Sequence, residues 1–225
     1  MPRTGPNTNP NPGVTQSAAP DFSAAPAPPI PPVEYGSKAE FVRNAFVKLR
    51  PNLEEQIERL KRPDADVEER ENAAIDIGKI GDAAGIPALV AALTGDPDSH
   101  VRYHAAYALG VLKDASAVPG LIESLRDPEC VVRRFAVSAM GKIGDPSAIP
   151  ALGDATHDTD RHVRETAAIA LGMIGGAAAV PALIDAMADE DAGVSSNAVI
   201  ALQQIGTPEA LAPISATKVE SNTEE

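Results

Sequence analysis

One pattern recurs in DSHVRYHAAYALGVL (98–112), ECVVRRFAVSAMGKI (129–143) and DRHVRETAAIALGMI (160–174) of the 225-residue chain. Each segment opens with an acidic residue, continues through Val-Arg to an Ala-rich stretch, and ends shortly after a glycine. A period near 31 that persists along a chain indicates a stack of similar helical units. The glycines mark this period, with a first interval of 32, at Gly78, Gly110, Gly141 and Gly172.

Each period has room for two helices. An acidic or proline-containing turn precedes an Ala-rich helix, for example 101–111, and a glycine-containing break precedes a second helix, for example 118–125. Proline is tolerated at the start of the second helix because a first-turn N–H has no partner within the helix. These prolines keep the register of the glycines, at Pro87, Pro119, Pro150 and Pro181.

A single unit cannot bury its own apolar face, so stability must come from stacking. We therefore predict an all-α fold, a right-handed α–α superhelix of about five repeats. Small residues of the first helix should let neighbouring helices approach closely, at Ala105, Ala136, Ala167 and Ala198. Larger aliphatic residues should form the continuous core, at Leu109, Met140, Leu171 and Leu202 together with Leu112, Ile143, Ile174 and Ile205.

The repeats leave distinct segments at both ends of the chain. Residues 1–36 hold 10 of the 21 prolines, which predicts an extended or disordered arm. In residues 37–62, Ser37 and Glu40 have the spacing of a capping box, and Pro51 can start a second helix, so we predict a helical hairpin cap. The repeats are assigned to 63–213 and an acidic tail to 214–225.

Composition and charge restrict the functional classes. The net charge is −13, which argues against binding nucleic acid through its phosphates or docking on an anionic membrane, and favours a partner with a basic segment. Cys130 is the only cysteine, so neither an internal disulfide nor a cysteine zinc cluster can form. No run approaches 18 apolar residues, and we expect a soluble, cytoplasmic protein.

The turn-and-helix phrases 98–102, 129–133 and 160–164, with the Pro-Ala-Leu starts of the second helices, resemble the phycobilisome-lyase-type HEAT-like repeat. The resemblance covers roughly 64–213 and implies a HEAT-type solenoid. Such repeats serve bilin lyases, chaperones, assembly factors and scaffolds, so the resemblance implies no single activity.

Two further series of residues follow the period. The first is acidic and is interpreted as helix N-caps, at Asp66, Asp98, Glu129, Asp160 and Asp191. The second is basic and is interpreted as bridges between neighbouring repeats, at Arg70, Arg102, Arg133 and Arg164. The alternative is that these two series form a binding stripe.

Glu123, Asp154 and Asp185 share one polar position of the second helix, which we expect on the concave side. At about 10 Å between packed helices, these carboxylates are too far apart to chelate one metal ion. They suit a basic segment of a partner lying across the groove, and the alternative is a solvated face without a ligand.

A second candidate surface is aromatic. Tyr103, His104, Tyr107 and Phe135 fall close together in a chain with only 3% aromatic residues. Exposed aromatic residues are frequent hot spots of protein interfaces. The alternative is that Tyr107 and Phe135 are half-buried packing residues.

No catalytic or metal site is expected. His100 and His104 have the i, i+4 spacing that can bind a metal, but His162 lies two repeats away and no acidic residue completes a recognised motif. We predict a non-catalytic adaptor or accessory subunit without a cofactor, which binds a partner through the acidic series, the aromatic patch and the arm. The alternative is a bilin or other tetrapyrrole lyase, or a chromophore chaperone.

Overall fold

The structure is a computed structural model that describes residues 52–221. Within this range the chain forms eleven α-helices, short 3-10 turns and no strand, which confirms the predicted all-α superhelix. The predicted arm (1–36) and the first helix of the predicted cap lie outside the described residues.

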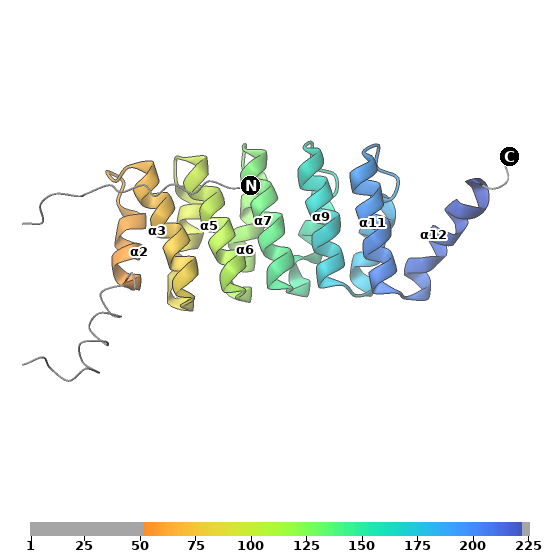
Figure 1. The fold of residues 1–225 in the computed structure, drawn as a ribbon, viewed down its shortest axis with the longest axis horizontal. Helices are drawn as coiled ribbons and strands as arrows, with labels where there is room; N and C mark the ends of the chain where they lie inside the picture. The colour runs from red at the N-terminus through yellow and green to blue at the C-terminus, as the bar shows by residue number, and fades with distance from the viewer. Residues whose placement is uncertain (1–51, 222–225) are drawn as a thin grey trace, which may run out of the picture. The chain divides into compact units, whose positions relative to one another are not determined.

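The longer helix of each repeat lies in one layer, where successive helices stand side by side (Figure 1). Each has fourteen residues and begins close to the predicted position. This long-helix layer consists of α3 (Val67–Ile80), α5 (Ser99–Leu112), α7 (Cys130–Ile143), α9 (Arg161–Ile174) and α11 (Ala192–Ile205).

Shorter helices alternate with them along the chain and form the second layer, which we call the short-helix layer. A 3-10 turn leads directly into each of the short helices α4, α6, α8 and α10. The layer consists of α2 (Leu53–Lys61), α4 (Ile86–Gly95), α6 (Val118–Glu123), α8 (Ile149–Ala155) and α10 (Val180–Ala186). The last helix, α12 (Pro208–Ser221), continues beyond residue 213, where the repeats were expected to end.

Most helix starts follow the capping chemistry that the sequence predicts. At four of the five predicted N-caps the Asp side chain accepts a backbone N–H of the first turn, whereas Glu129 makes no such bond. Proline occupies one of the first two positions of α4, α6, α8 and α10, as predicted. Helix α2 starts after Asn52, whose side chain accepts the Glu54 N–H, rather than at Pro51.

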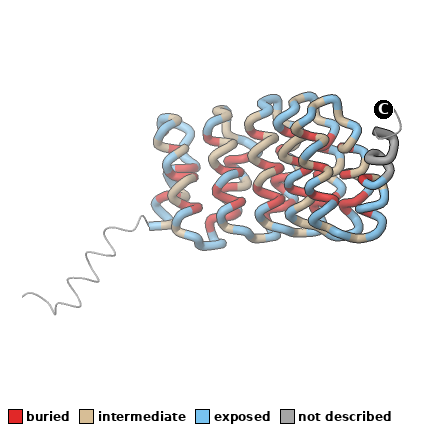
Figure 2. The backbone as a smooth tube through the Cα atoms, turned by 45° about the vertical axis from the view of Figure 1, so that its right-hand side comes forward, coloured by how far each residue is buried: buried red, intermediate tan, exposed pale blue. Residues whose placement is uncertain are grey.

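The core lies between the two layers, and Figure 2 shows the buried backbone positions recurring from repeat to repeat. The predicted core alanines and the first four of the larger residues, Leu109, Met140, Leu171 and Leu202, have exposed fractions of 0%. The other four are only partly buried and pack against the core, at Leu112, Ile143, Ile174 and Ile205. No helix in the described part of the chain is long and apolar enough to cross a membrane.

The glycines that mark the period lie inside the long helices, not in the breaks between helices. Each contacts an alanine of the next long helix, as Gly110 contacts Ala139. A Cβ added at Gly141 would lie 2.9 Å from the Ala170 Cβ and 3.0 Å from its Cα. The long helices therefore touch backbone to backbone, and glycine is required at this contact.

We expect Gly141→Ala to lower the free energy of unfolding by about 1–3 kcal/mol, because its methyl group meets backbone atoms that cannot move aside. The control is Gly95→Ala, where an added Cβ has no atom within 4 Å and φ is not positive. That change should be neutral or stabilising by up to about 1 kcal/mol. Urea denaturation of both variants measures the difference, and equal stabilities would contradict the contact.

Candidate partner-binding surfaces

A ladder of arginine–aspartate pairs joins each repeat to the next. Arg102 on α5 binds the Asp127 carboxylate through two hydrogen bonds of 2.7 and 3.0 Å. Arg133 on α7 binds Asp158 in the same way, with two bonds of 2.8 Å. All eight side chains have exposed fractions of only 7–13%, in the pairs Arg70–Asp96, Arg102–Asp127, Arg133–Asp158 and Arg164–Asp189.

Each arginine also binds the turn that precedes its own helix. Nη1 of Arg102 donates to the carbonyl of Asp96, while its other nitrogens bind Asp127 in the following turn. The aspartate in turn accepts a backbone N–H two residues ahead, as Asp127 does from Glu129. One guanidinium thus fixes two consecutive turns, which confirms that the arginines bridge neighbouring repeats.

The aspartates of this ladder were not recognised in the sequence, although they recur at intervals of 31 residues. They are Asp96, Asp127, Asp158 and Asp189. Their period is as regular as that of the arginines, so the signal was available. In the fifth repeat Ser195 occupies the arginine position, and its hydroxyl bonds to the Ala192 carbonyl within the same helix.

The hydrogen bonds from Arg164 hold the pKa of the Asp189 carboxyl below its usual value, against the opposing effect of burial. The folded pKa is thus below the unfolded value of about 3.9. The stability that this pair contributes is therefore present above about pH 4 and is lost as the pH falls through the folded pKa.

We expect Asp189→Asn to destabilise the protein by about 3 kcal/mol at pH 7, because it leaves the Arg164 charge without its partner. The gap to the unmodified protein should narrow as the pH falls below about 4, where Asp189 itself becomes protonated. Asp185→Asn, at an exposed carboxylate four residues away, is the control and should leave the pH dependence unchanged. Urea denaturation between pH 7 and pH 2 provides the measurement, and a constant gap would contradict the assignment.

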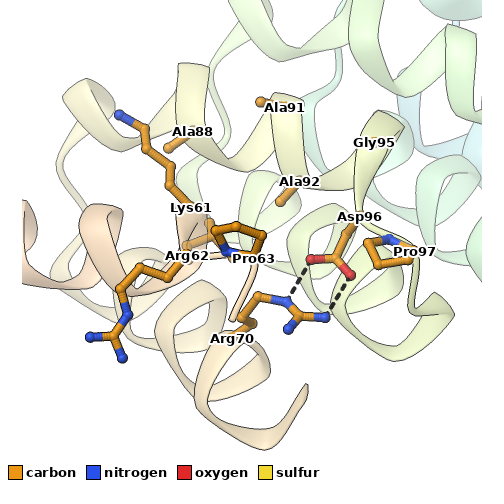
Figure 3. Close-up of a pocket in the computed structure, with 11 residues that line it drawn as sticks. Lys61, Arg62, Pro63, Arg70, Ala88, Ala91, Ala92, Gly95, Asp96 and Pro97 are labelled. Atoms are coloured by element: carbon orange, nitrogen blue, oxygen red, sulfur yellow. Dashed lines mark hydrogen bonds and ion pairs between the residues drawn. The ribbon is translucent and has the colours of Figure 1, made fainter. Parts of the chain in front are cut away.

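Grooves between successive short helices end at ladder aspartates. The groove between α2 and α4 has a volume of about 300 Å³, with Arg70 and Asp96 at one end and an alanine floor (Figure 3). Lys61 and Arg62 line its opposite side. This first groove is therefore basic at its rim.

The next two grooves carry the predicted acidic residues. Glu123 lines the groove between α4 and α6, which ends at Asp127, and Asp154 lines the groove between α6 and α8, which ends at Asp158. Exposed Arg126 lines both grooves, so the series is less uniformly acidic than predicted.

The acidic side chains themselves are available to a partner. Glu123, Asp154 and Asp185 are all exposed on the short-helix layer. None of these carboxylates has a hydrogen bond or ion pair within residues 52–221, unlike the ladder aspartates. We call these three residues the acidic stripe.

The predicted aromatic residues come together on the long-helix layer. The rings of Tyr103 and Phe135 stack with centroids 5.1 Å apart, and Tyr107 meets Phe135 edge-on at 6.4 Å. Tyr103 and Phe135 are half-buried against the core, whereas Tyr107 is 42% exposed. The His104 ring lies tilted against Tyr103 with centroids 4.3 Å apart, and its Nδ1 is buried without a hydrogen-bond partner in the described chain.

The structure does not join the two predicted binding sets into one surface. The acidic stripe belongs to α6, α8 and α10, and the aromatic residues belong to α5 and α7 of the other layer. A partner segment lying along one layer therefore meets one set and not the other.

One group in the described range could hold a metal ion, and it differs from the pair considered in the sequence. Single ligand atoms of Glu71, Asp98 and His100 lie within 4.8 Å of one another, while His104 is not part of the group. Two carboxylates and an imidazole suit a divalent cation such as zinc or manganese. However, the Oδ1 of Asp98 already caps α5 by accepting the His100 N–H at 2.8 Å.

A HEAT-repeat family profile matches residues 53–129 and 118–194, which together span more than half of the chain. The chain is a HEAT-repeat protein. Among curated proteins the comparison found no match.

Solved structures support the same assignment. The complex of CpcE and CpcF of phycocyanin lyase from Nostoc sp. PCC7120 is 28% identical, with a TM-score of 0.60, and the match covers 82% of this chain and 72% of that chain. The expected likeness to phycobilisome-lyase-type repeats is thereby confirmed.

Designed proteins are also similar. An engineered protein is 26% identical with a TM-score of 0.58, over 76% of this chain and 87% of that chain. A designed armadillo repeat protein in complex with the peptide (KR)4 is 20% identical with a TM-score of 0.55, over 77% and 91% of the two chains. This last likeness concerns the fold alone.

Proposed function

We propose that the chain is a cytoplasmic, non-catalytic interaction module, which binds a basic segment of a partner protein along the acidic stripe. The observation that carries this proposal is that Glu123, Asp154 and Asp185 are exposed and have no partner within the part of the chain that the structure describes. Each ladder aspartate, in contrast, is neutralised by an arginine. The three carboxylates can therefore pair with lysine or arginine of another molecule, and unlike other exposed acids such as Glu68 and Glu209 they recur at one position of successive short helices.

The grooves beside the acidic stripe can accommodate the apolar part of a partner's basic side chain in addition to pairing with its charge. Glu123 lines a groove with a volume of about 280 Å³, and Asp154 lines the next groove, with a volume of about 260 Å³. The second of these grooves has an apolar lining from Ile122, Leu125 and Ala151. A long basic side chain can lay its methylene groups there and place its charge against the carboxylate.

We expect the triple reversal Glu123→Lys, Asp154→Lys and Asp185→Lys to weaken binding of a labelled Lys/Arg-rich peptide at least tenfold in low salt. The loss should shrink as the ionic strength rises, because salt screens exposed charges. Fluorescence anisotropy at several salt concentrations gives the affinities.

A matched control carries the same change in net charge at exposed acids outside the stripe, namely Glu58→Lys, Glu68→Lys and Glu209→Lys. The control should retain most of the affinity. Equal losses in both triple variants would mean that only the overall charge matters, and the stripe would then be a solvated face.

The role of adaptor or accessory subunit fits the structural relative. The similar structure is a complex of two proteins, CpcE and CpcF. We propose that this chain likewise works within a larger assembly. The predicted arm (1–36) lies outside the described residues and remains a predicted second anchor.

The likeness to CpcE and CpcF also favours one alternative, a bilin or other tetrapyrrole lyase or chromophore chaperone. Purification of the tagged protein from its own host, followed by native mass and absorbance measurements, distinguishes the two functions. A colourless complex of fixed stoichiometry supports the adaptor. A bound pigment with a visible absorption band supports the alternative.

A further inference from the structure

Four of the five long helices together have the opposite charge sign to the whole chain, whereas the first, α3, holds four acidic and two basic residues. Helices α5, α7, α9 and α11 contain one acidic residue, Glu165, against six basic residues, with one in α5, three in α7 and two in α9. The whole chain, in contrast, has a net charge of −13. Acidic residues are therefore scarce in these four helices, although they are abundant elsewhere, including in α3.

The same layer also exposes large apolar side chains at two fixed helix positions. Tyr107, Ile169 and Ile200 share one position in their repeats, with exposed fractions of 42–49%. Val111 and Met173 share the next position one turn along, with 43% and 57%. Apolar residues clustered in this way mark interaction surfaces more often than single exposed ones do.

Two cations lie against the aromatic residues of this layer. The Nζ of Lys142 lies 5.1 Å from the Tyr107 ring centroid, and the guanidinium of Arg134 lies 5.7 Å from that of Phe135. Within residues 52–221 neither cation has a carboxylate partner. Every arginine of the ladder, in contrast, has one.

We propose that this region is a second docking surface, which binds an acidic, apolar segment of a partner protein. We call it the aromatic–cation face, and it comprises Tyr103, Tyr107, Val111, Arg134, Phe135 and Lys142. The partner's apolar side chains contact Tyr107 and Val111, and its carboxylates pair with Lys142 and Arg134. Held beside the rings, these cations are already positioned for such ion pairs.

Charge complementarity selects this occupant. A basic segment would be repelled by Arg134 and Lys142, neither of which has an ion pair among the described residues. A wholly apolar segment would leave both cations unpaired beneath it, at a cost in free energy. An acidic, apolar segment satisfies both the rings and the charges.

This inference does not depend on the proposed function, because it concerns the other layer. Together the two surfaces give the protein two chemically different docking faces, one for basic and one for acidic segments. A module of this kind can bridge two partners.

Panning a displayed library of random peptides on the full chain tests the proposal. Among the selected peptides, some should bind the Lys142→Glu and Tyr107→Ser variants at least tenfold more weakly than the unmodified protein. We expect these peptides to be rich in Asp and Glu together with Leu or Phe. Peptides whose binding is weakened by substitutions in the acidic stripe should instead be basic. Their binding tests the proposed function independently of the aromatic–cation face.

Matched controls occupy the same helix positions in other repeats. Lys79 on α3 corresponds to Lys142 but pairs with Asp76 at 2.9 Å, and Ile200 on α11 corresponds to Tyr107. Lys79→Glu and Ile200→Ser should change the affinity of the selected acidic peptides less than twofold. Thermal melting of all four variants should match the unmodified protein, since the replaced side chains are exposed.

Three results would overturn the proposal. The first is that no acidic peptide depends on Lys142 and Tyr107. The second is that Lys79→Glu weakens binding as much as Lys142→Glu. The third is a homodimer in analytical ultracentrifugation that Lys142→Glu dissociates, because the occupant would then be a second copy of this chain.

Discussion

The arginine–aspartate ladder is the interaction on which the arrangement of the solenoid depends. Each guanidinium holds the carbonyl of one inter-repeat turn and the carboxylate of the next, so the offset between consecutive repeats is fixed at every step. Apolar contacts alone are not directional. The hydrogen bonds of the ladder are directional, so they fix how each repeat is oriented on the next. As a result, the grooves of the short-helix layer and the equivalent positions of the long helices recur at a constant offset along the stack.

Much of this fold could be predicted from the sequence, because the features that define it are periodic. The acidic caps, the prolines and the buried aliphatic positions each recur once per repeat, and apart from Glu129, which makes no capping bond, the structure places them as expected. The period also contains the ladder aspartates, which could have been recognised in the same way. The close backbone contact at Gly141 could not be predicted in this way, because a recurring glycine indicates a turn as readily as a close contact between helices.

The candidate surfaces were harder to predict than the fold. The predicted proximity of the aromatic residues is confirmed, but the structure places Tyr107 on α5 of one layer and Glu123 on α6 of the other. The difference between Tyr107, which is exposed, and Phe135, which packs on the core, depends on how adjacent long helices approach each other. The distance between adjacent long helices is set by the packing of a glycine on one helix against an alanine on the next. The sequence of a single helix therefore does not predict this distance.

The replacement of the ladder arginine by Ser195 makes the two ends of the stack unequal. Four repeats are fastened to their successors by charged hydrogen bonds, but the fifth has no guanidinium to hold the segment that follows it. In a solenoid each unit interacts mainly with its neighbours, so local opening can begin where the coupling between units is weakest. The amides of α11 and α12 should therefore exchange with solvent sooner than those of α5 and α7, and unfolding would proceed as fraying from the carboxyl-terminal end.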